Sequence, residues 1–413
     1  MKIGLLAYHA ACNFGANLQL LSTVEYLKKE FESVLVINWV PIDLEEYYRD
    51  VTPKCQYKMH LQFQKEYYHL TSLCRTAEDV ANVIMMEGIQ AVIIGSDAVA
   101  QCHPFISRIS FPTLTLFSVN KLTEDRKFPN PFWGTFNDYL KKPIPIAVIS
   151  ASSQDTAFNL IGEKTRKKIS GAIESYKYVS VRDVWTQKMF SSLTRNAINP
   201  PITPDPVFGF NHNVCMNISL DKDFIIRKFD LPEDYLLFSF HDSRTVSIGW
   251  LEHIEKLAAE KGLCCVAMPF TNGLKFENKL KKKIDLPLSP LEWYYLIKYS
   301  KGYIGHNMHP IVIALHNAVP FFSFDNYGTR YVRGGLLSNE KTSKIYHILS
   351  EADYMENRSS CINRLSTPPV PDYVMQKILD FDVEKAKKFA DTYYQKYRFM
   401  MRDMCSSLKL ALD

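Results

Sequence analysis

Short apolar runs alternate with longer amphipathic segments along the first half of the chain. The runs have the length of buried strands, which we predict at Lys2–Tyr8, Val34–Val40, Ala91–Ile94, Pro145–Ser150 and Tyr178–Val181. Between them, apolar residues recur at helical spacing, and this pattern predicts helices at Asn17–Glu30, Glu78–Glu87 and Glu163–Ser175. Strands that alternate with helices indicate a parallel sheet covered by helices, so we predict an α/β fold.

The second half of the chain repeats the alternation. Strands are predicted at Tyr235–Phe240, Cys264–Met268, Gly302–Gly305 and Pro320–Phe324. Helices are predicted at Trp250–Lys261, Pro290–Lys301 and Pro310–Ala318. We therefore predict two Rossmann-like, doubly wound domains. In open α/β sheets ligands bind beyond the carboxyl ends of the strands, so the cleft between the domains is the expected site.

The predicted boundary between the domains lies near Phe210–Asp221, where the stretch Asn211–Asn213 is interpreted as part of a linker. The first domain then covers 1–210 and the second covers 221–365. A helical segment follows at 366–413, with helical spacing at Val383–Tyr394. By analogy, this segment is expected to cross back to the first domain.

Two insertions interrupt the first domain. The stretch 41–76 is rich in Tyr, Gln, Lys and His and shows no clear period, so no element is predicted there. The stretch 103–144 carries several prolines and many aromatic residues. Its composition predicts a long excursion over the surface, around a site.

Composition and charge exclude several classes of protein. The 413 residues are 46% hydrophobic and 23% charged, which is typical of a folded globular chain. With 49 Lys and Arg against 44 Asp and Glu, the net charge of +5 is too small for a dedicated nucleic-acid binder. It is compatible with an anionic substrate or an anionic membrane surface.

Location and redox state follow from the same kind of argument. The chain shows neither a secretory signal nor 18 consecutive apolar residues, so we expect a cytoplasmic protein with peripheral membrane contact at most. Nine scattered cysteines without a C-x-x-C pair predict reduced thiols and no zinc site.

The turn after the first predicted strand, Tyr8–Gln19, is a candidate ligand site. Free N–H groups at the start of the following helix bind anions or polar groups. The turn contains one glycine, Gly15, and neither a dinucleotide nor a P-loop motif, so no nucleotide cofactor is implied. A purely structural interpretation remains open, with Gly15 reversing the chain and Asn17 capping the helix.

Two further turns carry chemistry. Arg182 follows a strand in Ser180-Val181-Arg182-Asp183, where its guanidinium could bind a phosphate or carboxylate, or could form a structural pair with an aspartate. His309 stands at the predicted entrance of a helix, where it could transfer a proton near neutral pH or cap the turn. A metal site made of His306 and His309, with or without His316, is disfavoured, because no carboxylate accompanies them at a suitable spacing.

Together, the turns resemble the polysaccharide pyruvyl transferase family in order and placement. The matching motifs are N-x-G-A-x-L-Q from Asn13 to Gln19, G-S-D at Gly95–Asp97, S-x-R-D at Ser180–Asp183, D-P at Asp205-Pro206, and a turn bearing His309 before an apolar helix. The resemblance spans most of residues 1–330. It implies two domains in a GT-B-like arrangement, with the first domain on the acceptor side.

The resemblance also implies the reaction. Phosphoenolpyruvate would be the donor substrate, with no other cofactor and no metal, and a free or lipid-linked sugar of a bacterial capsule or exopolysaccharide would be the acceptor. Arg182 would hold the donor phosphate or carboxylate, and His309 would transfer protons. Substrate-binding positions carried over in this way are Asn13, Gly15, Gln19, Ser96, Asp97, Asp183 and Asn307.

This chain departs from the family pattern in the turn that bears His309. Asn307 stands where the family usually has Arg, and Pro310 stands where it usually has Gly. An amide lacks the permanent charge and the bidentate fork of a guanidinium. Another cation could compensate, and the sequence candidates are Lys301, Arg330, Arg333 and Lys344.

The missing arginine is also compatible with a different donor, or with a protein that has lost its activity. Two rival functions therefore stay open. One is a GT-B glycosyltransferase that uses a nucleotide-sugar, and the other is a non-catalytic relative that binds sugar.

Overall fold

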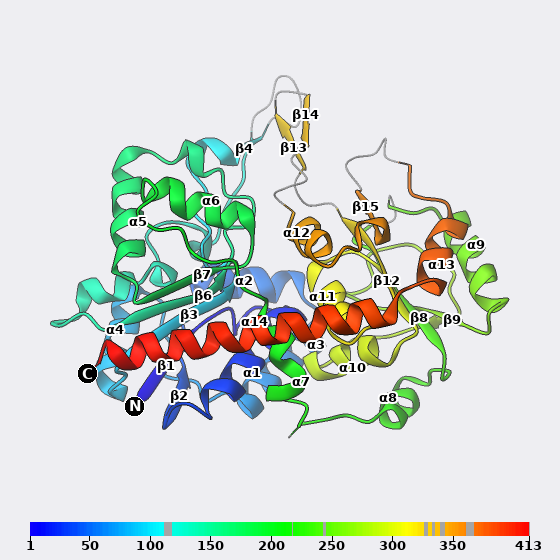
Figure 1. The fold of residues 1–413 in the computed structure, drawn as a ribbon, viewed down its shortest axis with the longest axis horizontal. Coiled ribbons are helices and arrows are strands. Elements are labelled where there is room, and N and C mark those ends of the chain that lie inside the picture. Colours follow the sequence, from blue (N-terminus) through cyan, green and yellow to red (C-terminus); the bar gives the residue numbers. More distant parts are fainter. Residues whose placement is uncertain are drawn as a thin grey trace.

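The structure is a computed structural model of the chain. It describes residues 1–110, 118–216, 218–242, 245–325, 329–332, 335–338, 343–360 and 367–412. Figure 1 shows two α/β lobes side by side, with a long C-terminal helix running across both of them.

The first lobe is built on a five-stranded sheet in the order β2-β1-β3-β6-β7. Its strands are β1 (Lys2–Leu6), β2 (Ser33–Val36), β3 (Ala91–Asp97), β6 (Ile146–Ala151) and β7 (Tyr178–Val181). All neighbouring strands pair in parallel. The residues of β1, β3 and β6 are buried almost throughout, because helices cover both faces of a parallel sheet.

The second lobe is built on a six-stranded parallel sheet in the order β10-β9-β8-β11-β12-β15. Its strands are β8 (Tyr235–Ser239), β9 (Cys264–Ala267), β10 (Lys282–Lys283), β11 (Gly302–Gly305), β12 (Phe321–Asp325) and β15 (Arg358–Ser360). Two antiparallel pairs lie outside the sheets: β4 (Ile109–Ser110) with β5 (Ser118–Val119), and β13 (Thr329–Val332) with β14 (Gly335–Ser338). The two parallel sheets confirm the predicted fold class.

Helices connect the strands and cover the sheets. In the first lobe they are α1 (Phe14–Leu27), α2 (Ile42–Val51), α3 (Lys54–Tyr67), α4 (Ala77–Glu87), α5 (Glu163–Ser175), α6 (Val184–Leu193) and α7 (Phe210–Asn213). In the second lobe they are α8 (Lys222–Phe229), α9 (Ile248–Ala259), α10 (Pro290–Tyr299), α11 (Met308–His316), α12 (Lys344–Glu351) and α13 (Pro371–Leu379), before the terminal α14 (Val383–Leu410).

Helices α1, α9 and α11 begin two or three residues earlier than the sequence predicts. Helix α1 is capped by Asn13, whose side-chain oxygen accepts a hydrogen bond from the Ala16 N–H at 3.1 Å. The predicted cap, Asn17, is inside the helix, and its amide donates to backbone carbonyls of the preceding turn. In α11, Pro310 is the third residue instead of the first, which is tolerated because first-turn N–H groups have no helical partner.

The insertions are more ordered than their composition indicates. The aperiodic stretch 41–76 contains α2 and α3. The composition of 103–144 predicts a surface excursion, yet Phe132, Trp133 and Phe136 are buried in the core of the first lobe. They belong to two short 3₁₀ helices, η3 (Pro131–Trp133) and η4 (Thr135–Tyr139). The burial energy of these aromatic side chains explains why the segment folds back onto the sheet.

The predicted linker stretch Asn211–Asn213 belongs to a packed helix, α7. Phe210 is fully buried, and the Asn213 amide donates to the backbone carbonyl of Ser22 and to the Tyr397 hydroxyl. Aromatic packing and these side-chain bonds hold the segment against α1 and α14, so it is not a free connection.

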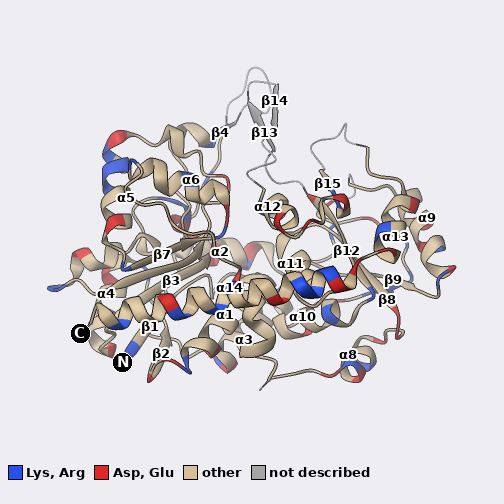
Figure 2. Cartoon of the chain, viewed as in Figure 1, with Lys and Arg blue, Asp and Glu red and all other residues tan. Residues whose placement is uncertain are grey.

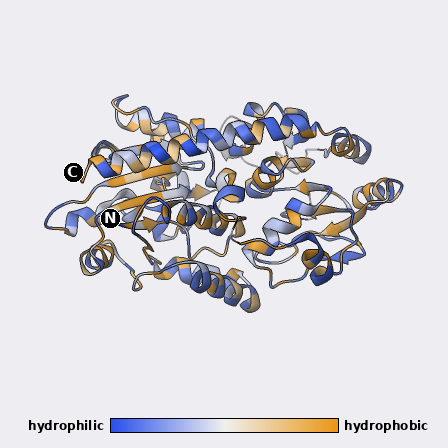
Figure 3. Cartoon of the chain, turned by 60° about the horizontal axis from the view of Figure 1, so that its bottom comes forward, coloured by the Kyte–Doolittle hydropathy of each residue, from blue (hydrophilic) through white to orange (hydrophobic). Residues whose placement is uncertain are grey.

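Helix α14 joins the two lobes. At one end Lys385 forms an ion pair with Asp353 of the second lobe at 2.7 Å, and at the other Lys409 pairs with Glu30 of the first lobe at 3.2 Å. Figure 3 shows hydrophobic and hydrophilic residues alternating along this helix. Its buried stripe includes Tyr393, Tyr397 and several methionines, which pack against both lobes.

Surface charge is mixed in sign. Figure 2 shows Lys and Arg interspersed with Asp and Glu over the outer helices, in keeping with the small net charge. None of the helices in the described ranges combines the length and the apolar character that a bilayer crossing requires.

The packing of α14 on the first lobe generates a test. A Cβ added at Gly209 would lie 2.3 Å from a ring carbon of Tyr397 and 2.8 Å from the Asn213 side-chain nitrogen. We predict that Gly209→Ala lowers the free energy of unfolding by about 1–3 kcal/mol, measured by urea unfolding, because the buried ring must move. Gly162→Ala is the control, since its Cβ would meet nothing within 4 Å. Equal stability of the two variants would contradict this packing.

Candidate functional site

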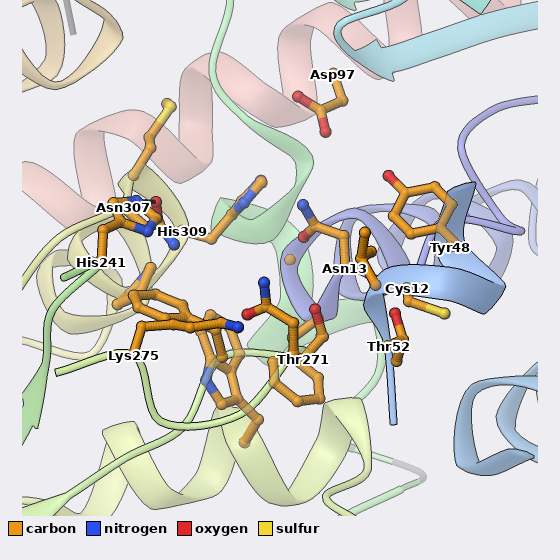
Figure 4. A pocket seen from close by; sticks show the side chains of 18 of the residues that line it. Cys12, Asn13, Tyr48, Thr52, Asp97, His241, Thr271, Lys275, Asn307 and His309 are labelled. Atoms are coloured by element: carbon orange, nitrogen blue, oxygen red, sulfur yellow. Dashed lines mark hydrogen bonds between the residues drawn. The ribbon is translucent and has the colours of Figure 1, made fainter. Parts of the chain in front are cut away.

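A cavity of about 420 Å³ lies between the two lobes, and residues of both line it. In Figure 4, Asn13, Cys12 and Tyr48 of the first lobe face His241 and Asn307 of the second across this space. Such a volume is typical of small-molecule sites. The structure therefore contains an interdomain site where the topology predicts one.

The strand order explains the position of the cavity. In the first sheet the chain passes from β1 to β2 on one side and to β3 on the other, so the order reverses at β1. In the second sheet the same reversal occurs at β8, between β9 and β11. Cavity residues lie at or beyond the carboxyl ends of these strands: Asn13 caps α1 after β1, Asp97 ends β3, and His241 and Asn307 come shortly after β8 and β11. Crevices at such switch points bind ligands.

Six of the nine predicted site residues line the cavity, namely Asn13, Gly15, Asp97, Arg182, Asn307 and His309. The other three are buried outside its lining. Gln19 donates a hydrogen bond to Asp205, and Asp183 caps α6 by accepting from the Thr186 N–H at 2.8 Å. Ser96 is buried, and its hydroxyl has no hydrogen-bond partner among the described residues.

Arg182 forms the centre of a buried charge network. Its two terminal nitrogens donate to Asp205 and to Asp97, both at 2.8 Å. Asp205 also accepts the Gln19 hydrogen bond and, on its other oxygen, one from the Val207 N–H at 3.0 Å. Arg182 is only 4% exposed; a carboxylate accepts from each terminal nitrogen, while the buried Nε has no hydrogen-bond partner among the described residues. This geometry matches the structural pairing that the sequence left open, with Asp97 and Asp205 as partners.

A second cation, Lys344, lies beside Asp97. Lys344, the first residue of α12, places its Nζ atom 3.8 Å from the carboxylate that Arg182 binds. Burial raises the pKa of Asp97, but the Arg182 and Lys344 charges oppose this and the net shift is downward. Burial and the neighbouring Arg182 lower the pKa of Lys344 to about 8. Asp97 is therefore ionised and Lys344 mostly protonated at neutral pH.

His309 reaches the same place from the second lobe. Its Nε2 atom is 3.9 Å from Asp205, and it has no hydrogen-bond partner among the described residues. Burial lowers the pKa of His309, an effect that Asp205 and Asp97 oppose only in part. The imidazole is neutral at pH 7, with a nitrogen available to accept a proton.

Gly15 permits the close approach of the two lobes at this point. A Cβ at this position would lie 2.0 Å from Cγ of His309 and 2.6 Å from its Cβ. Any side chain would displace the imidazole. The requirement for glycine here comes from a contact with a residue almost 300 positions away.

Asn307 is held by a histidine. The side-chain oxygen of Asn307 lies 2.7 Å from Nε2 of His241, and the His241 ring stacks between His306 and Phe270. The backbone of Asn307 has φ 79° and ψ 147°, a conformation that residues other than glycine rarely adopt. Asp97 also has a positive φ, 75°. Strained backbone at two cavity positions is typical of functional sites.

Several cavity residues could not be located from the sequence. Tyr48 and Thr52 come from α2 and its end, in the insertion for which no element is predicted, and Lys275 and Phe270 come from the connection after β9. Neither segment carries a periodic signal. Asp205 differs from these residues. Its D-P motif is recognisable in the sequence, but its central position in the charge network around Arg182 is not.

The four compensating cations considered for Asn307 fall in different places. Lys344 lines the cavity. Lys301 pairs with Asp234 at 3.3 Å at the amino-terminal edge of the second sheet, away from the site. The side chains of Arg330 and Arg333 lie outside the described residues.

Within the described ranges, no group of three or more His, Cys, Asp or Glu side chains could hold a metal ion. His306, one of the histidines considered for a metal, accepts a hydrogen bond from the His241 N–H at 2.9 Å. His316 lies at the far end of α11.

Fold and site define a class of protein: two Rossmann-like domains with a shared interdomain cavity, the arrangement of GT-B glycosyltransferases and related epimerases. The UDP-GlcNAc 2-epimerase from Neisseria meningitidis, bound to UDP-GlcNAc, aligns with a TM-score of 0.54 over 97% of this chain and 99% of that one, at 10% identity. A ugt transferase from Siraitia grosvenorii in complex with UDP aligns with a TM-score of 0.49 over 99% of each chain, at 9% identity. At 10% identity the likeness to the epimerase shows the fold alone.

The family follows from the sequence. A family model of polysaccharide pyruvyl transferases matches residues 13–327, and the chain belongs to this family. This match confirms the resemblance that the motifs carry. A search of curated proteins found no sequence match.

The contact between Gly15 and His309 is directly testable. We predict that Gly15→Ala shifts the His309 imidazole resonances in NMR spectra and costs about 1–3 kcal/mol of stability, because the added methyl displaces the ring. Gly171→Ala in α5 is the matched helical control, since its Cβ would meet nothing within 4 Å. Unchanged His309 resonances in Gly15→Ala would contradict the contact.

The charge network predicts a cost in stability. Arg182→Met should lower the free energy of unfolding at neutral pH by about 3–5 kcal/mol, because Asp97 and Asp205 would stay buried without their partner. The control is Arg195→Met, which removes an exposed pair with Glu163 and should cost less than about 1 kcal/mol.

The pKa of Asp97 predicts how the stability cost of Arg182→Met changes with pH. The pKa of Asp97 is lowered on folding, so its contribution is present at neutral pH and is lost as the pH falls below about 4. Without Arg182, the pKa of the buried Asp97 would be raised instead. The stability difference between wild type and Arg182→Met, measured by urea unfolding, should therefore shrink between about pH 7 and about pH 3. A constant difference would contradict the network.

Proposed function

We propose that this protein transfers pyruvate from phosphoenolpyruvate to a pair of hydroxyls on one sugar, forming a ketal. The family assignment supports the transferase chemistry. The observation that carries the proposal is the position of His309, a neutral imidazole in an interdomain cavity that also contains the cations of Arg182 and Lys344. A group that accepts and returns a proton thus lies beside positive charge, as an anionic donor requires.

The reaction needs two additions at the same carbon. In the first, a sugar hydroxyl oxygen bonds to C2 of phosphoenolpyruvate and loses its proton, while the methylene carbon gains one. In the second, C2 bonds to another hydroxyl oxygen as its bond to the phosphate oxygen breaks, and that hydroxyl proton leaves with the phosphate. We assign to His309 the transfer of the first proton, from the hydroxyl to the methylene carbon.

The charged residues around His309 have different tasks in this proposal. Arg182 keeps Asp97 and Asp205 in place and offsets part of their negative charge at the cavity wall. The carboxylate of Asp205, 3.9 Å from His309 Nε2, stabilises the imidazolium that forms when the ring takes up the hydroxyl proton. Arg182 thereby acts through the residues that it orients.

The acceptor has an aromatic wall available. Tyr47 and Tyr48 of α2 line the cavity together with Trp293 of α10, and such rings pack against the apolar faces of sugars. The hydroxyl of Tyr48 points into the space in Figure 4. We place the acceptor against this wall, as a sugar of a bacterial capsule or exopolysaccharide, and a lipid-linked form would need only peripheral contact at the cytoplasmic membrane face.

The role of His309 can be tested by its replacement. His309→Gln should reduce ketal formation by about 10²–10⁴-fold, because the amide cannot take up a proton. In the assay the enzyme is incubated with phosphoenolpyruvate and a panel of nucleotide-linked and lipid-linked sugars. The ketal is detected by mass spectrometry, and the released phosphate by a colorimetric assay. Circular dichroism should show an unchanged fold.

His253→Gln is the matched control, because this histidine is half exposed, pairs with Asp372 and lies away from the cavity. It should leave turnover unchanged. Wild-type protein that binds a nucleotide-sugar tightly and ignores phosphoenolpyruvate would overturn the proposal in favour of a glycosyltransferase. Sugar binding without turnover of either donor would indicate a non-catalytic relative.

A further inference from the structure

The donor proposed above carries a phosphate and a carboxylate, so its binding requires a cation with free hydrogen-bond donors. Arg182 is poorly placed for this task, because one N–H of each terminal nitrogen donates to a carboxylate at 2.8 Å, and its Nε, which has no hydrogen-bond partner among the described residues, is buried. An anion that replaced the carboxylates on the two terminal nitrogens would displace Asp97 or Asp205 and leave that carboxylate buried without a partner, at a large cost. The donor anion therefore needs another partner.

Asn307 does not meet the requirement either. Its side chain is uncharged, and its oxygen lies 2.7 Å from the His241 ring, which is itself held between two other rings. The position that usually supplies a guanidinium in the family is here committed to organising the wall of the second lobe.

Lys344 has what these two residues lack. Its Nζ atom makes no hydrogen bond to any residue that the structure describes, and its nearest charged partner is Asp97 at 3.8 Å, beyond hydrogen-bond distance. The side chain is 14% exposed and lines the same cavity as His309. An ammonium in such a sheltered place interacts with an anion more strongly than one in open water.

The backbone of Lys344 is anchored. Ser343 caps α12 by accepting from the Tyr346 N–H at 3.1 Å, and its hydroxyl donates to Asp325 at the end of β12. Asp325 also accepts from Arg358 Nε at 2.9 Å. These bonds tie the start of α12 to the carboxyl edge of the second sheet, so the lysine is presented from a fixed point.

Resting on the proposed function, we infer that Lys344 is the cation that binds the anionic end of the donor, by its phosphate or its carboxylate, and so takes over the task of the missing arginine. Lys275, the other cavity lysine without a described partner, is exposed. Water screens the charge of Lys275 far more than that of Lys344. Lys275 therefore contributes to the long-range attraction of the donor anion more than to its binding. Lys344 comes from the second lobe, and the donor thereby bridges it to the first.

The electrostatic surroundings of Lys344 make binding sensitive to pH. Several elements present charged or titratable groups toward it: Arg182, Asp97, Asp183, Asp205, His309, and also His347, Glu351 and Lys396 in the adjoining smaller cavity. Burial lowers the pKa of both His309 and His347, so neither gains charge above pH 7. The lysine itself has its pKa lowered to about 8, so it loses its charge as the pH rises further.

Calorimetric titration with phosphoenolpyruvate tests the inference on the full-length protein. Lys344→Met should weaken binding roughly 10- to 100-fold, the amount expected for one lost charged hydrogen bond. Lys344→Arg should bind within about threefold of wild type. Lys301→Met removes the same charge at a half-exposed ion pair away from the cavity and should bind like wild type.

A pH series distinguishes binding from a merely structural role. Wild-type affinity should fall above pH 8 by up to about tenfold per pH unit as Lys344 loses its proton. Lys344→Arg should show a flat profile over the same range, because a guanidinium stays charged. The melting temperature of Lys344→Met should equal or exceed that of wild type, since the substitution removes a buried charge beside Arg182.

Competition identifies the end of the donor that is bound. If the phosphate is the partner, inorganic phosphate should compete in wild type and not in Lys344→Met, and if the carboxylate is the partner, pyruvate should do so. Wild-type affinity in Lys344→Met, or matching pH profiles in wild type and Lys344→Arg, would overturn the inference and leave the proposed function standing. Folded wild-type protein that does not bind phosphoenolpyruvate at all would overturn both.

Discussion

The interaction on which the site depends is the bridge from Arg182 to two buried carboxylates. Charges removed from water are tolerated only when partners satisfy them, and here one guanidinium serves Asp97 at the end of β3 and Asp205 at the start of η6 (Pro206–Gly209). Gln19 joins the same cluster from α1. Four separate segments of the first lobe therefore meet at one point and form one wall of the cavity.

The second lobe contributes the groups that can respond to a ligand. His309 enters where Gly15 leaves room for it, and Lys344 enters beside Asp97 with its hydrogen-bond donors free among the described residues. The first lobe thus supplies fixed, paired charges, while the second supplies a neutral imidazole and an ammonium that, among the described residues, lies 3.8 Å from Asp97 and makes no hydrogen bond. Such a division suits chemistry in which an anionic donor and a neutral sugar must meet in a cavity between two domains.

Much of this could be predicted from the sequence, because buried parallel strands leave a strong signal. The apolar runs located the main strands, and the rule that ligands bind at their carboxyl ends pointed to Asp97, Arg182 and His309. The rule does not say which way a side chain points. Asp183 lies in a turn that this rule selects, but it is used as a helix cap, and Gln19 lies inside α1 and donates to the buried Asp205.

What could not be predicted depends on contacts between distant segments. Tyr48 belongs to α2, a short and mostly polar helix in which Leu44 is the buried residue, so its position is set by tertiary packing. The occupied fork of Arg182 is equally invisible in the local motif, because the carboxylates that it binds come from two other turns and not from the neighbouring Asp183. Lys344 could be named as a candidate cation, yet only the fold separates it from Lys301.

The most direct test of the proposed site is a crystal structure of the protein with phosphoenolpyruvate bound. We expect a phosphate or carboxylate oxygen within about 3 Å of Lys344 Nζ, with the methylene carbon facing His309 and the Arg182 bonds to Asp97 and Asp205 intact. A donor bound bidentately to Arg182, with either aspartate displaced and Lys344 apart from the ligand, would contradict the proposed site.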